Sequence, residues 1–211
     1  MTRIIWLLLC GIMICFGAAC TQKAALDNKK GNAMGAEIVK VYRQNIEPLR
    51  FIGKKYGNPD RVDGNFGKLW GQWHANGWFG VLEKLYDGNI KNIYEDGDAY
   101  IGLMRWKNGE LFEYWIGMFM PANTTVPEGF DHIDFPKSDL GVAWLYGKEP
   151  EVIAKQDEAP KALVKNGFEI VVGADGAHWF FERYVCPRFT TPDKKGNIIL
   201  DVCFFIKEEG K

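Results

Sequence analysis

Apolar residues recur with the spacing of strands and helices along most of the chain after residue 45. Residues 46–56 have the composition of a β-strand that ends at a turn signal. From Phe66 on, apolar residues lie at helical spacing, and the preceding residues 63–65 offer an N-cap. The pattern predicts a strand followed by a helix, which breaks or kinks at Asn76-Gly77 and continues over 78–85.

Two further strands are expected at 100–106 and 111–120. Between them lies Asn108-Gly109, and this dipeptide is the strongest short signal for a β-hairpin. The first half of the chain therefore has the order β-α-β-β.

The second half repeats this order after a loop at 121–129. The expected elements are a strand at 132–147 with an interruption at 136–139, a helix at 149–166, and strands at 178–184 and 198–206. Pro160 falls inside the expected helix, which predicts a kink or a late start. The sequence predicts an α+β fold built from a duplicated β-α-β-β unit.

The N-terminus has the pattern of a secretory signal. An apolar run at 4–16 is shorter than the ~18 to 20 residues that span a bilayer, and it ends in Gly17-Ala18-Ala19-Cys20. Small residues before a cysteine resemble the lipobox of lipoproteins, although Gly17 stands where that pattern prefers leucine. We expect a signal peptide at 1–19 and an acylated Cys20. The alternatives are ordinary secretion and an uncleaved anchor.

These features predict an envelope lipoprotein, anchored to a membrane by its N-terminal lipid and facing the periplasm or the exterior. Residues 20–36 lack a sustained apolar period and are expected to be a flexible tether, which leaves 37–211 as the folded body. Cys186 and Cys203 remain after processing. In an oxidising compartment they are either a disulfide or two buried thiols on neighbouring strands.

Composition, charge and the absence of known motifs argue against several classes of function. The chain has 211 residues and a net charge of -1, so no general basic field is available for a nucleic acid. The sequence has no dinucleotide-binding, phosphate-loop or serine-hydrolase motif, and its three histidines are far apart. We expect no cofactor, no metal and no nucleic-acid partner. The eight tryptophans exceed what a core of this size needs.

The chain resembles the GyrI-like small-molecule-binding domain. This domain is the effector-binding module of AraC-type and multidrug-responsive regulators, and it also occurs alone in integron-associated proteins. The resemblance lies in the order of six segments: FIGKKYG (51–57), FGKLWGQW (66–73), DAYIGLMRW (98–106), FEYWIGMFMPANTTVPEGF (112–130), LGVAWLYG (140–147) and HWFFERY (178–184).

The resemblance implies two halves around a pseudo-two-fold axis, with a ligand cleft between them. In that family aromatic walls hold planar or lipophilic cations, and a carboxylate on a strand of the second half faces the cleft. Glu182 matches this carboxylate by its position in the penultimate strand.

The residues themselves support the same interpretation of Glu182. Alternation along 178–184 places it on one face with Phe180 and Tyr184. A carboxylate among aromatic side chains is costly unless it has a cationic ligand, hydrogen-bond donors or a raised pKa. The structural alternatives are solvent exposure and an ion pair with Arg105 or Arg183.

Further candidates for the ligand site follow from the duplication. Aligning the halves places Met104 at the position of Glu182 and Trp106 at that of Tyr184, so that Tyr100, Met104 and Trp106 face the cleft. Trp70 and Trp73, one helical turn apart, are expected to close the cleft unless they are core residues. Tyr146 is a weaker candidate.

We expect the chain to bind small amphipathic or cationic molecules by desolvation in an aromatic cleft and by pairing with Glu182. The rival function is hydrolysis of strained, cyclopropane-containing molecules, with Glu182 as general base and Tyr184 as proton donor. A third hypothesis is a structural module of the envelope in which Glu182 forms a salt bridge.

Overall fold

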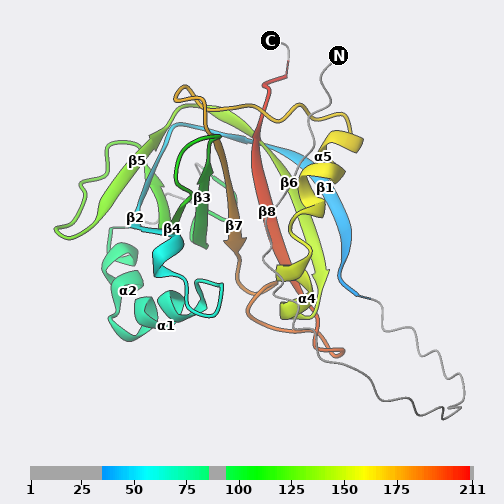
Figure 1. Ribbon diagram of the computed structural model, residues 1–211, viewed down its shortest axis with the longest axis horizontal. Coiled ribbons are helices and arrows are strands. Elements are labelled where there is room, and N and C mark those ends of the chain that lie inside the picture. The colour runs from blue at the N-terminus through cyan, green and yellow to red at the C-terminus, as the bar shows by residue number, and fades with distance from the viewer. Residues whose placement is uncertain (1–34, 86–93, 210–211) are drawn as a thin grey trace, which may run out of the picture. The chain divides into compact units, whose positions relative to one another are not determined.

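The protein is described by a computed structural model for residues 35–85 and 94–209 (Figure 1). Residues 34–211 form one compact unit that contains every described helix and strand. The clusters of buried apolar side chains also lie within it, so this part of the chain carries its own core. The expected signal peptide, Cys20 and most of the expected tether lie outside the described residues.

Strands dominate the described chain. They are β1 (Glu37–Ile46), β2 (Leu49–Gly57), β3 (Tyr100–Trp106), β4 (Glu113–Pro121), β5 (Asp131–Phe135), β6 (Ser138–Gly147), β7 (His178–Tyr184) and β8 (Ile198–Ile206). The helices are α1 (Gly67–Ala75), α2 (Trp78–Glu83), α4 (Glu149–Ala154) and α5 (Glu158–Lys165), and a 3-10 turn, η1, covers Asn58–Asp60.

The strands form one antiparallel sheet in the order β1-β6-β8-β7-β3-β4-β2-β5. At its centre β3 pairs with β7, and Leu103 lies opposite Phe181. The strand order outward from this pair is β3-β4-β2 in one half and β7-β8-β6 in the other. A pseudo-two-fold axis therefore passes through the Leu103–Phe181 pair, and the predicted duplication is confirmed.

Each half has one strand more than the sequence predicts. β1 precedes the first unit but pairs with β6 of the second, and β5 precedes the second unit but pairs with β2 of the first. The repeated unit is therefore β-β-α-β-β, and the two halves exchange their first strands.

A proline lies between the first two strands of each half, and the sequence predicted only the second of these breaks. The expected strand at 46–56 contains Pro48, and the structure ends β1 before it and begins β2 after it. The interruption expected at 136–139 is confirmed, because β5 ends at Phe135 and β6 begins at Ser138, on either side of Pro136. Proline cannot donate a ladder hydrogen bond, so each proline marks the change from one edge of the sheet to the other.

The expected breaks in both helices are confirmed. Gly77 has a φ of 65° between α1 and α2, in the left-handed region that favours glycine. The second helix ends at Ala154 and starts again at Glu158, which places Pro160 in the first turn of α5. Pro160 therefore causes a late start.

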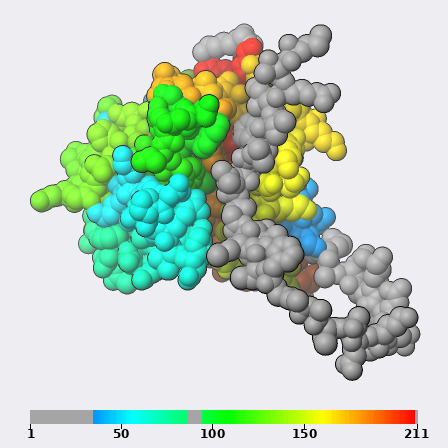
Figure 2. Space-filling view, in the orientation of Figure 1, coloured from blue at the N-terminus to red at the C-terminus, as the bar shows by residue number. Residues whose placement is uncertain are grey.

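The helices cover one face of the sheet in two groups. α1 and α2 pack on the first half, against side chains such as Ile52 and Ile116. α4 and α5 pack on the second half, against Leu145 and Leu200. Figure 2 shows α1 and α2 in blue-green and α5 in yellow, on opposite sides of the same view.

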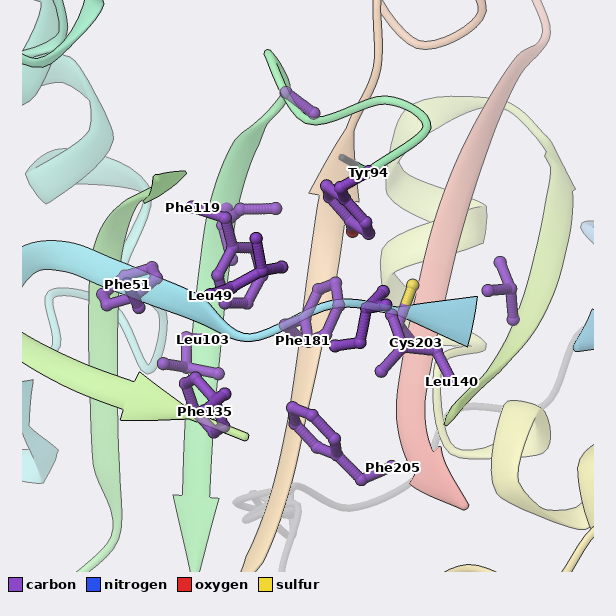
Figure 3. Packing of buried hydrophobic residues seen from close by; sticks show 14 of the residues in the cluster. Leu49, Phe51, Tyr94, Leu103, Phe119, Phe135, Leu140, Phe181, Cys203 and Phe205 are labelled. Atoms are coloured by element: carbon purple, nitrogen blue, oxygen red, sulfur yellow. The ribbon is translucent and has the colours of Figure 1, made fainter. Parts of the chain in front are cut away.

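The opposite face of the sheet curls over a second layer of apolar side chains (Figure 3). Phe135 from β5, at one edge, stacks on Phe205 of β8 with 5.0 Å between ring centroids. Phe119 and Phe181 meet in the same layer at 5.1 Å. Both faces of the central strands are therefore buried, which makes β7 a rigid support for the side chains that it carries.

The two remaining cysteines do not form a disulfide in this structure. Cys186 is exposed and Cys203 is buried, and both are free thiols. The alternative of two buried thiols is right for Cys203 and wrong for Cys186, which lies beyond the end of β7. In the described part of the chain no helix combines the length and the apolar character needed to cross a bilayer.

Candidate functional site

Glu182 lies on β7, on the face of the sheet that carries the helices. Its relative exposure is 5%. The Tyr184 hydroxyl donates a hydrogen bond to Oε2 over 2.6 Å, and the Tyr114 hydroxyl lies 3.4 Å from the same oxygen. The Gln156 side chain, between α4 and α5, also lies near the carboxylate and lowers its pKa. Both halves of the fold therefore contribute to the surroundings of Glu182.

The electrostatic environment of Glu182 is unfavourable for a charge. Among residues 35–85 and 94–209, no lysine or arginine nitrogen lies within 4.0 Å of its carboxylate. Burial raises the pKa of the Glu182 carboxyl, and the hydrogen bonds oppose this shift. Burial also raises the pKa of Tyr114 and of Tyr184 well above the ordinary value, so both hydroxyls remain donors.

Neither structural alternative for Glu182 fits this arrangement. Arg183 points to the other face of the sheet, where its Nη2 lies 2.7 Å from Asp201. Arg105 is on that face as well, and its Nε lies 2.8 Å from Asp175. The alternative of an ion pair between Glu182 and either arginine is therefore wrong for the described chain, and the carboxylate is not exposed to solvent.

Aromatic side chains surround the carboxylate. Trp70 on α1 donates from its indole Nε1 to the Tyr114 hydroxyl over 2.9 Å, and its ring lies 4.7 Å from the ring of Tyr184. Phe180 stacks on Phe204 at 5.0 Å. The site lies where the apolar clusters under the two helix groups meet, because Phe180 packs against both.

Five of the predicted residues gather at this junction: Glu182, Tyr184, Phe180, Met104 and Trp70. The register places Met104 opposite Phe180, and Met104 is buried. Tyr100 lies opposite Tyr184, but its ring stacks on Phe79 and its hydroxyl donates to Glu83. Tyr100 therefore lies at the edge of the site.

The other predicted side chains lie elsewhere. Trp73 is fully buried and donates from its indole to the Tyr56 hydroxyl over 2.9 Å. The alternative interpretation of Trp73 as a core residue is therefore right. Trp106 is 43% exposed and packs on His178 at the end of the central strands. The Tyr146 hydroxyl donates to Asp193 in a turn.

Three contributors to the site were missed: Tyr114, Gln156 and Gly102. Tyr114 comes from β4 and Gln156 from the link between α4 and α5, and only the three-dimensional pairing brings them to Glu182. Gly102 lies opposite Glu182 in the β3–β7 register. Side chains alternate along a strand, so Gly102 is expected on the same face as Met104. The sequence around Gly102 does not show which residues of other strands lie next to it.

A shallow depression of about 230 Å³ lies elsewhere, at the ends of β6 and β8. Its lining residues are Ser138, Val171, Phe205, Ile206, Lys207 and Glu208. It contains none of the side chains that surround Glu182. We place the candidate site at Glu182, because it combines a buried carboxylate with aromatic walls, whereas the depression presents mainly apolar side chains at an exposed sheet end.

Comparison with known proteins identifies the fold. No protein-family profile and no curated protein matches the chain. The structure of SAV2435 bound to tetraphenylphosphonium matches with a TM-score of 0.57 and 18% identity over 80% of this chain and 94% of that one. A putative bacterial transcription regulation protein from Staphylococcus aureus MU50 matches with a TM-score of 0.55 and 17% identity, over 80% and 99%.

The chain has the GyrI-like fold. The C-terminal domain of EcmrR also matches, with a TM-score of 0.50 and 10% identity over 80% of this chain and 98% of that domain. The GyrI-like body here accounts for nearly the whole of each of these solved structures, and the expected α+β architecture with two halves is confirmed.

Proposed function

We propose that this GyrI-like chain binds small organic cations that carry aromatic or lipophilic groups. The observation that carries the proposal is Glu182, a buried carboxylate among aromatic side chains with no lysine or arginine nitrogen within 4.0 Å in the described residues. A buried carboxylate without a counter-charge is costly, and a bound cation supplies that charge.

The surrounding rings suit the same ligand class. Trp70, Tyr114 and Tyr184 present aromatic faces and edges, which attract cations and pack on flat apolar groups. Glu182 is 5% exposed, so a ligand reaches it only after some of these side chains move. Trp70 contacts both tyrosines that bond to Glu182, so it is the side chain whose movement we propose on ligand entry.

A solved structure of the same fold supports the ligand class. SAV2435 binds tetraphenylphosphonium, an aromatic cation. Tetraphenylphosphonium is therefore a suitable first probe for this chain.

Hydrolysis is the second candidate function, and one observation favours it. The Tyr184 hydroxyl donates to Glu182 over 2.6 Å, and burial raises the pKa of that carboxyl, so the pair holds a base and a proton donor side by side. Turnover of a cyclopropane-containing substrate, lost in Glu182→Gln, would establish this function. Binding of cations without turnover of such substrates supports the first.

The binding experiment is a calorimetric titration of tetraphenylphosphonium at several pH values. Burial raises the pKa of Glu182, and the cation pairs with the ionised form. Below that pKa, binding must first expel the proton, so affinity is expected to fall by up to about tenfold per pH unit as the pH decreases. Above it, affinity is expected to be constant. Equal affinity from pH 4.5 to 8 would contradict a role for the carboxylate.

We further propose that the chain acts in the cell envelope as a membrane-anchored lipoprotein. The support is in the sequence: a short apolar run that ends in Gly17-Ala18-Ala19-Cys20. In that compartment a cation-binding domain meets molecules that enter or leave the cell.

Cys20→Ala is expected to abolish lipid attachment and the cleavage of the signal peptide. The lipid anchor is attached to this thiol, and no other cysteine follows it before Cys186. Intact mass of the membrane fraction is expected to show a diacylglycerol on the wild-type chain, and the variant is expected to remain a longer precursor. Unchanged mass and membrane association in the variant would refute the lipoprotein assignment.

A further inference from the structure

The two halves differ in side-chain size at the position of Gly102. Because the pseudo-two-fold axis passes through the Leu103–Phe181 pair, Gly102 on β3 is the equivalent of Phe180 on β7. In the second half, Phe180 fills its position with a ring that stacks on Phe204. In the first half, the equivalent position carries no side chain.

The space above Gly102 is occupied by groups from neighbouring strands. A Cβ atom at residue 102 would lie 2.6 Å from the Tyr114 hydroxyl oxygen and 3.0 Å from Glu182 Oε2. Both distances are shorter than ordinary van der Waals contact. The missing side chain at Gly102 is therefore what allows Tyr114 from β4 to reach across β3 to Glu182 on β7.

The Tyr114 ring has little freedom to avoid such a clash. It stacks face to face on Phe66, with 4.1 Å between centroids and 2° between planes. Its hydroxyl also accepts the hydrogen bond from the Trp70 indole. A methyl group at residue 102 would therefore push the hydroxyl away from the carboxylate or disturb these two contacts.

We infer that Gly102 is a positioning residue for cation binding: it gives the Tyr114 hydroxyl access to Glu182, and this donor favours the ionised carboxylate that pairs with the ligand. The inference rests on the proposed function. The polar groups that face Glu182 are the hydroxyls of Tyr114 and Tyr184 and the side chain of Gln156. In the described chain no lysine or arginine nitrogen lies within 4.0 Å of the Glu182 carboxylate. Each hydrogen-bond donor therefore directly affects the ionisation of the Glu182 carboxyl.

The test is a cycle of Gly102→Ala, Tyr114→Phe and the double variant, made in the unit 34–211. The carboxyl 13C resonance of Glu182, assigned by its loss in Glu182→Gln, gives its pKa without any ligand. Tyr114→Phe is expected to raise this pKa by about one unit, because it removes a donor to the charged form, and to lower tetraphenylphosphonium affinity at neutral pH or below by up to about tenfold.

Gly102→Ala is expected to raise the pKa of Glu182 and weaken binding in the same direction. In the Tyr114→Phe background the same change is expected to have little further effect, because the hydroxyl that the methyl group would meet is gone. Tyr56→Phe is the matched control. Its hydroxyl also accepts from an α1 indole, that of Trp73, but belongs to the core away from Glu182.

Each other outcome has a distinct meaning. If Gly102→Ala weakens binding equally in both backgrounds and leaves the Glu182 pKa unchanged, the methyl group only obstructs the ligand and the inference is wrong. If Gly102→Ala fails to fold and the double variant folds, the conflict with Tyr114 is demonstrated by rescue. If the wild-type chain binds no cation, the proposed function fails, while the pKa cycle still decides the positioning role.

Discussion

Replacing Glu182 with glutamine is expected to lower the affinity for tetraphenylphosphonium by about tenfold to a hundredfold. Glutamine keeps the shape of the side chain and removes its charge. A charge-assisted contact in a buried site contributes about 1.5 to 3 kcal/mol, which corresponds to this loss. Titration calorimetry on the two proteins at neutral pH measures the difference directly.

Two controls separate charge pairing at Glu182 from general effects. Glu169→Gln makes the same change in net charge at an exposed carboxylate that pairs with Lys207, and it should leave affinity unchanged. Phenyltrimethylammonium and its neutral isostere tert-butylbenzene have nearly the same shape. Only the cation should lose affinity in Glu182→Gln. Equal losses for both ligands would show that the substitution damages the site sterically.

The Glu182→Gln protein should remain folded. The direction of its change in stability follows from the pKa of Glu182. Burial raises this pKa above the unfolded value, so the folded state binds more protons between the two values. Glu182 therefore stabilises most below the unfolded pKa, and stability falls as the pH rises through the folded pKa. The glutamine variant lacks this loss and is expected to be at least as stable as wild type at neutral pH.

The largest expected effect on stability is at Asp201, on the opposite face of the sheet. Asp201 and Arg183 are fully buried, and Asp201 also accepts hydrogen bonds from Arg188. Asp201→Asn leaves the buried Arg183 guanidinium without its main counter-charge. Removing one partner of a buried pair costs about 3 to 5 kcal/mol of unfolding free energy. Urea denaturation of the unit 34–211 is the measurement.

Asp134→Asn is the matched control, because Asp134 also pairs with an arginine, Arg50, but its side chain is 57% exposed. Exposed pairs contribute about 0 to 1 kcal/mol. Similar, small losses in both variants would show that the other partners of Arg183 are sufficient: Tyr94 and Gln44, whose side-chain oxygens each lie 2.8 Å from its Nη1, and Asp96 at 3.5 Å from its Nη2.

Local periodicity predicted the central strands of the sheet. β3, β7 and β8 have the predicted bounds, and the alternation along β7 placed Glu182 and Arg183 on opposite faces. Most of β1, the first strand of the first half, was not predicted, and β5 was predicted only as the part of one strand that precedes an interruption. β1 and β5 are edge strands with mixed polar composition, and their partners lie in the other half of the chain, so no local pattern specifies the pairing.

The candidate site was also predictable only in part, namely for the residues that lie on one strand. Alternation on one strand identifies Glu182 and Tyr184, whereas Tyr114 and Gly102 join them only through the pairing of β3 with β4 and β7. Helical spacing could not separate Trp70 from Trp73. The structure does, because Trp70 bonds to a tyrosine at the site and Trp73 to one in the core.

The most direct test of cation binding at Glu182 is a crystal structure with tetraphenylarsonium, which has the shape of tetraphenylphosphonium and an anomalous scatterer at its centre. We expect the arsenic peak between α1 and the α4–α5 pair, with the Glu182 carboxylate within about 6 Å, the range in which opposite charges stabilise each other. Trp70 should be displaced from Tyr114. An arsenic peak in the depression lined by Phe205 and Lys207, with Trp70 still bonded to Tyr114, would contradict this account.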